Sequence, residues 1–295
     1  DARERCPPPS LERLLNLGAM QDHAVRALRA APDMLWRVRN LLHLRAKRTQ
    51  DRLTFQDQED IAVELGFQDG ATLGVEQFMQ TYYRHARNVA GITERLLKRA
   101  RPFRRIKLAP LTDLPQGIVA TESEIGFERS WVLDARPEIA LDLFAEVVRH
   151  GRPATEEAKD DITAVAGDPS WCQALRRTRT ANASFCKLLC HAGEVPLRRN
   201  SILGELHELG LLLAMIPEFE PVTGVVQHDV YHVYTVDVHS IAAVDRLRAL
   251  MRGDFALEQP LASQLAAETP RPLPLYLGLL CHDIGKVYGK DHSRQ

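Results

Sequence analysis

Apolar and polar residues alternate with the period of an α-helix over the first hundred residues. Apolar stripes at helical spacing occur within residues 10–31 and 33–47, and a longer stripe runs over 73–100. Before the last stripe, Thr54 and Asp57 have the spacing of a capping box, in which each residue caps the other at a helix start. The pattern therefore predicts several helices and no strand in this region.

Residues 103–134 have a different pattern, in which β-branched and aromatic residues are separated by turn formers such as Gly117 and Gly126. Short apolar runs of this kind predict a small β element of two or three strands. The helical period then returns in the stripes that begin at Ile139, and again in the segments 175–189, 205–216, 237–251 and 275–284. The predicted fold class is mainly α, a helical bundle region with a small β insertion followed by the start of an all-α domain.

Composition excludes several classes of protein. The 38 basic and 39 acidic residues leave a formal charge of −1, so no broad basic surface for nucleic acid is expected. No apolar run reaches the roughly 18 residues that a membrane helix needs. Five cysteines, an odd number, without a preceding signal peptide favour a reduced, cytoplasmic setting.

Histidines concentrate near the end of the chain, where five of the eleven lie within residues 228–292. His282 is followed directly by Asp283, and imidazole with carboxylate is a ligand set for a divalent hydrolytic metal. The pattern predicts metal-assisted phosphoester hydrolysis. The remaining six histidines are isolated, and each is expected to be an ordinary surface or core residue: His23, His43, His85, His150, His191 and His207.

Helical periodicity also indicates how the predicted ligands could meet. His239 is expected in the first turn of the helix over 237–251, off its apolar stripe. His282 and Asp283 are expected in the last turn of the apolar helix over 275–284, and His292 lies in a loop beyond it. If the two helices pack side by side, all four residues can approach one ion.

These motifs resemble the HD superfamily of metal-dependent phosphohydrolases and, more closely, the family of bacterial PII uridylyltransferase/uridylyl-removing enzymes. The resemblance to the HD domain of that family rests on QHDVYHVYTVDVHS at 227–240, HDIGK at 282–286 and GKDHS at 289–293. The segments WRVRNLLHL at 36–44 and FMQTYYRHA at 78–86 resemble its helical region between the transferase and HD domains. The resemblance implies three segments. Residues 1–102 would be the helical region after a nucleotidyltransferase domain that is not in this sequence. Residues 103–225 would be a linker region with the β element, and residues 226–295 the N-terminal part of the HD domain.

The resemblance also implies roles for individual residues. His239, His282 and Asp283 would hold a divalent ion, Mn²⁺ or Mg²⁺, with Asp283 bridging to a second ion that His292 also binds. Asp283 and Lys286 would act in catalysis, Lys286 by neutralising substrate phosphate. His232 and Asp237 would orient a ligand imidazole or a water molecule by hydrogen bonding. Caps and turn contacts of an ordinary loop explain both residues equally well.

The implied reaction is hydrolysis of the phosphodiester that joins UMP to a tyrosine of uridylylated PII, in a protein that also carries nucleotidyltransferase activity. A small-molecule effector would be sensed by domains that are not in this sequence. Two alternatives stay open: an HD phosphohydrolase acting on a free nucleotide, and a degenerate HD scaffold without catalysis. Val238 stands where the family usually has glutamate. Because the sequence stops before the closing aspartate of the family, residues 1–295 alone are expected to be weakly active or inactive.

Overall fold

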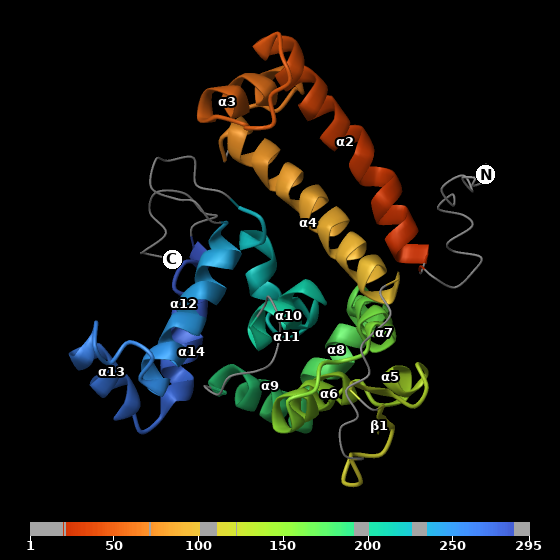
Figure 1. The fold of residues 1–295 in the computed structure, drawn as a ribbon, viewed down its shortest axis with the longest axis vertical. Coiled ribbons are helices and arrows are strands. Elements are labelled where there is room, and N and C mark those ends of the chain that lie inside the picture. Colours follow the sequence, from red (N-terminus) through yellow and green to blue (C-terminus); the bar gives the residue numbers. More distant parts are fainter. Residues whose placement is uncertain are drawn as a thin grey trace, which may run out of the picture. The chain divides into compact units, whose positions relative to one another are not determined.

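The computed structural model describes residues 20, 22–70, 72–100, 111–121, 123–191, 201–225 and 235–285. The chain forms two compact units, Asp1–Pro102 and Phe103–Gln295. Most of the described residues are helical, as predicted (Figure 1). None of the described helices is both long and apolar enough to cross a membrane.

The first unit is built on two long helices that pack against each other, with a short helix between them in the sequence. These are α2 (Asp22–Ala46), α3 (Phe55–Glu64) and α4 (Gly74–Ala100). The predicted capping box is confirmed: the Thr54 hydroxyl accepts from the Asp57 amide, and the Asp57 carboxylate accepts from the Thr54 amide. The stripes predicted within 10–31 and 33–47 belong to one helix over their described part, because α2 continues through Pro32. Residues 10–19 and 21 lie outside the described part.

A β-hairpin is the predicted β element of the second unit. Strand β1 (Ile118–Ala120) pairs antiparallel with β2 (Ile125–Phe127), so that Ile118 lies opposite Phe127. Within the described residues the sheet has two strands. The predicted β region extended to residue 134, but its end is occupied by helix α5 (Val132–Ala135). Its first two residues, Val132 and Leu133, are both buried, and consecutive residues of a strand would point to opposite faces.

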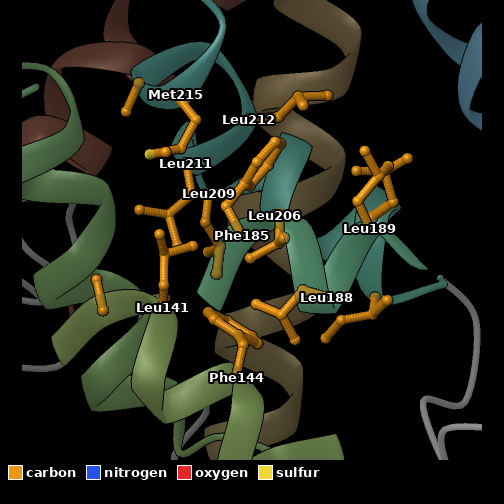
Figure 2. Packing of buried hydrophobic residues seen from close by; sticks show 14 of the residues in the cluster. Leu141, Phe144, Phe185, Leu188, Leu189, Leu206, Leu209, Leu211, Leu212 and Met215 are labelled. Atoms are coloured by element: carbon orange, nitrogen blue, oxygen red, sulfur yellow. The ribbon is translucent and has the colours of Figure 1, made fainter. Parts of the chain in front are cut away.

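Helices surround one continuous core in the second unit. Figure 2 shows part of it, where Leu141 and Phe144 meet Phe185, Leu188 and leucines of the next helices. Between α5 and residue 192 the unit has α6 (Ile139–His150), α7 (Glu156–Ala166), α8 (Pro169–Arg177) and α9 (Arg179–Cys190). The predicted stripe over 175–189 therefore spans two helices, which separate at Thr178.

The predicted helix over 205–216 is likewise divided in two. Helix α10 (Ile202–Glu208) and helix α11 (Leu211–Met215) are separated by Gly210, whose φ of +83° is left-handed. Glycine adopts this conformation without steric cost, and it redirects the chain. The turn of 3₁₀-helix that follows, η1, spans Pro217–Val222.

Three helices complete the second unit: α12 (Val236–Arg252), α13 (Pro260–Ala267) and α14 (Pro272–Cys281). Helix α12 packs against both α13 and α14, and α14 also packs against α9 (Figure 1). Val244 of α12 and Tyr276 of α14 are fully buried in the same core as Leu188 and Leu206. Residues 235–285 thus share one core with the helices before them.

Candidate metal centre

Helix α12 carries His239 in its first turn. The Val236 amide donates to the Val225 carbonyl at 2.8 Å, and the His239 amide closes the first helical turn on the Thr235 carbonyl, also at 2.8 Å. The face of the helix that includes Ile241 and Val244 is buried. His239 lies off that face, and its side chain is 45% exposed. The ring is therefore held at the edge of the core with access to solvent.

Helix α14 brings the other two residues to the same place. Proline occupies its first position, where no amide hydrogen is needed, and Tyr276 and Leu280 anchor it in the core. The helix ends at Cys281, and His282 keeps helical backbone angles as the cap residue. As a result, His282 is exposed while the next residue, Asp283, is buried.

The three side chains converge, as the spacing predicts. One donor atom from each of His239, His282 and Asp283 lies within 4.8 Å of the others. Asp283 Oδ2 is 3.8 Å from His239 Nε2 and 3.2 Å from His282 Nε2. Ligand bonds of about 2.1 Å at a tetrahedral angle would separate two donors by roughly 3.4 Å. The observed spacing and the donor types fit a divalent ion.

The ring of His282 is oriented for this task by its own helix. Its Nδ1 lies 2.7 Å from the carbonyl oxygen of Leu279. Because a carbonyl only accepts, Nδ1 carries the hydrogen, and Nε2 of a neutral ring is then left with a lone pair. That nitrogen faces the Asp283 carboxylate, so the tautomer suits metal binding.

Cys281, next to the two predicted ligands, has different electrostatics. Burial, and to a lesser degree the charge of Glu218, raises the pKa of its thiol. Among the described residues, the donor atoms that converge belong to His239, His282 and Asp283, and the Cys281 sulfur is not one of them. The cluster therefore consists of two imidazoles and one carboxylate.

The remaining predicted site residues divide into two groups. Asp237 is described, and it is fully buried; its carboxylate accepts from the Gly224 amide at 3.1 Å and lies 2.7 Å from His207 Nε2. His232, Lys286 and His292 lie outside the described residues, so their predicted roles remain predictions.

His207 is a residue that the sequence did not single out. It is buried on α10, and its partner Asp237 is 30 residues away in the sequence. No spacing rule connects the two positions, because the contact depends on how α10 packs against α12. A histidine inside an apolar helix was the only available signal.

Comparison with known proteins identifies, over most of the chain, the family that the sequence motifs resemble. A family model described as GlnD PII-uridylyltransferase matches residues 8–97. A bifunctional uridylyltransferase/uridylyl-removing enzyme of Azotobacter vinelandii is 31% identical over 99% of this chain and 32% of its own length. An enzyme with the same name from Ruegeria pomeroyi is 33% identical over 95% of this chain and 31% of its own length.

The chain spans about a third of the length of these curated relatives. No solved structure is significantly similar to it. The similarity to the relatives nevertheless runs through both compact units, from the helical region to the histidine cluster. The chain belongs to the family of bifunctional uridylyltransferase/uridylyl-removing enzymes.

Proposed function

We propose that this chain carries the uridylyl-removing centre of its family and hydrolyses, in the cytoplasm, the phosphodiester between UMP and a tyrosine of uridylylated PII. The observation that carries the proposal is the convergence of His239, His282 and Asp283 within 4.8 Å. The relatives are named for both transfer and removal of a uridylyl group. The proposal assigns the removal reaction to the second unit.

The protein would hold one divalent ion, Mn²⁺ or Mg²⁺, with the Nε2 atoms of both histidines and the carboxylate of Asp283. When bound, that ion would supply Lewis acidity, which activates water and offsets charge on the phosphoryl oxygens. Asp283 contributes negative charge at a buried position, so the centre favours a cation strongly. Lys286 is proposed to contact the substrate phosphate, and His292 to support a second ion.

The side chains are positioned before any substrate arrives. The Leu279 carbonyl fixes the His282 ring, and the first turn of α12 fixes the backbone of His239. The two histidines are 37% and 45% exposed, so a phosphodiester on the surface of another protein can reach them. This accessibility permits a protein-attached nucleotide as substrate.

The test is Mn²⁺-dependent release of UMP from uridylylated PII by the full-length enzyme, beside a panel of free nucleotides; residues 1–295 alone are expected to release UMP weakly or not at all. We expect release from PII to fall at least about 100-fold in His239→Ala and His282→Ala, because each loses one direct ligand. His150→Gln is the matched control, since His150 lies on α6 and contacts Glu146. Hydrolysis of free nucleotides but not of uridylylated PII would favour a nucleotide phosphohydrolase, and no metal-dependent hydrolysis at all would favour a non-catalytic scaffold.

A further inference from the structure

A buried histidine–aspartate pair lies directly behind the candidate metal centre. His207 Nε2 is 2.7 Å from Asp237 Oδ2, with their side chains 5% and 0% exposed. The other carboxylate oxygen of Asp237 accepts from the Gly224 amide at 3.1 Å. Asp237 therefore ties the start of α12 both to α10 and to the turn after η1.

The start of α12 needs such support because its cap residue provides none. Thr235 makes no side-chain hydrogen bond to the first turn, although threonine at this position often does. Asp237 is the second helical residue, and His239 follows two positions later. Since each residue turns an α-helix by about 100°, the two side chains point to nearly opposite sides of α12. Asp237 faces α10, while His239 faces the end of α14.

Helix α10 is itself firmly held. Glu205, on the same helix, forms a buried ion pair with Lys159 of α7, with 2.6 Å between Nζ and Oε1. Leu203 and Leu206 are buried in the main core. A contact from α10 to Asp237 can therefore transmit a fixed position to α12.

We propose that His207 is a positioning residue of the metal centre. Through Asp237 it fixes the first turn of α12, and so it sets the distance from His239 to Asp283. The inference rests on the proposed function for its metal, but the His207–Asp237 pair acts on the helix whether or not an ion is bound. The pair is more than part of the core, because it restrains the turn of α12 that carries His239.

The matched variants are His207→Ala, His207→Gln and Trp171→Phe. Alanine removes the contact with Asp237, whereas the amide of glutamine lies close to the position of a histidine Nε2 and can donate in its place. Trp171→Phe, on α8, removes the buried hydrogen bond that the indole donates to the Leu133 carbonyl at 2.9 Å. It separates loss of positioning from general loss of stability, because it leaves His207, Asp237 and the Glu205–Lys159 pair intact.

The first readout is Mn²⁺ affinity. Only the Mn²⁺ binding that is lost in His239→Ala is counted as binding to this centre. We expect His207→Ala to weaken Mn²⁺ affinity about 10- to 100-fold, as is usual when a residue that orients a metal ligand is lost. His207→Gln should restore most of the affinity, and Trp171→Phe should keep it. Unchanged affinity in His207→Ala, or an equal loss in Trp171→Phe, would overturn the proposal.

The second readout is amide hydrogen exchange in metal-free protein. The amides of Val236 and His239, which are bonded to Val225 and Thr235, report on the first turn of α12. His207→Ala should speed their exchange while leaving Val244 and Leu247, in the middle of the helix, unchanged. If all four amides exchange as in the unmodified protein, positioning by His207 is refuted. If exchange changes as expected but no His239-dependent Mn²⁺ binding exists, the proposed function fails and the positioning role stands.

Discussion

The Nε2 atom of His282 lies 3.2 Å from Oδ2 of Asp283, its neighbour in the sequence. The Leu279 carbonyl accepts a hydrogen bond from the other ring nitrogen, Nδ1. The Nε2 atom of a neutral His282 ring therefore directs its lone pair toward a carboxylate oxygen of Asp283. Two electron-rich atoms this close repel each other unless a cation lies between them. A divalent ion relieves that repulsion and gains His239 as a further ligand.

We therefore predict that Mn²⁺ stabilises the folded protein through this cluster. At a free concentration of 100 times its dissociation constant, the ion should raise the free energy of unfolding by about 2.7 kcal/mol. Asp283→Asn should remove this stabilisation, because it removes the charge and keeps the shape. Thermal unfolding with and without Mn²⁺ measures the effect, and Asp254→Asn, in the turn after α12, is the control. Equal stabilisation of both variants would place the ion elsewhere.

Only part of the site is local in the sequence. His282 and Asp283 are adjacent, and helix periodicity places His239 off the apolar stripe of α12, but their convergence also required the assumption that α12 and α14 pack side by side. The pair of His207 and Asp237 could not be found in this way. It exists only because α10 and α12 meet in the folded core.

The mainly helical fold could be predicted because an apolar stripe depends only on residues that are near in the sequence. The prediction failed where polar residues are buried. Helix α7 was not predicted, since Glu156, Lys159 and Asp160 have the polar character of a solvent-exposed segment and yet are buried. Their burial depends on partners such as Glu205, far along the chain. The breaks at Thr178 and Gly210 were missed as well, because the apolar spacing continues through both.

The buried ion pairs of Lys159 provide a second prediction. Burial by itself lowers the pKa of the ammonium group, but the charges of Glu205 and Glu156 outweigh it and raise the pKa. Lys159→Met leaves both carboxylates buried without their cation, and we expect it to destabilise the protein by about 3–5 kcal/mol. Adding Glu156→Gln and Glu205→Gln should restore much of that loss. Urea unfolding of the single and triple variants measures both effects, and a triple variant no more stable than the single one would contradict this account.

Two glycines offer a matched comparison of backbone strain and crowding. Gly117 and Gly253 have left-handed φ angles of +92° and +83°. A Cβ at Gly253 would meet nothing within 4 Å, whereas one at Gly117 would lie 2.9 Å from both Ile139 and Val132. Gly253→Ala should cost about 1 kcal/mol, the usual cost of a left-handed alanine. Gly117→Ala should cost about 1–3 kcal/mol more, through overpacking of the core beneath the hairpin. Equal destabilisation in urea unfolding would show that the core yields freely there.

Asp142 of α6 should make stability depend on pH. Burial raises the pKa of its carboxyl group, and a hydrogen bond donated by Ser184 at 2.9 Å opposes that shift only in part. The folded state thus binds a proton more tightly than the unfolded chain does. The contribution of Asp142 to stability is complete below the unfolded pKa of about 3.9, and it is lost as pH rises through the raised folded value.

Asp142→Asn stays neutral at every pH, so the variant should gain stability relative to the unmodified protein as pH rises from about 3.5 to 7. Urea unfolding across that range measures the difference, with Asp134→Asn, an exposed position on α5, as the control. A difference that shrinks with rising pH would mean that the ionised Asp142 is stabilised by its surroundings, and the inferred direction of the shift would be wrong.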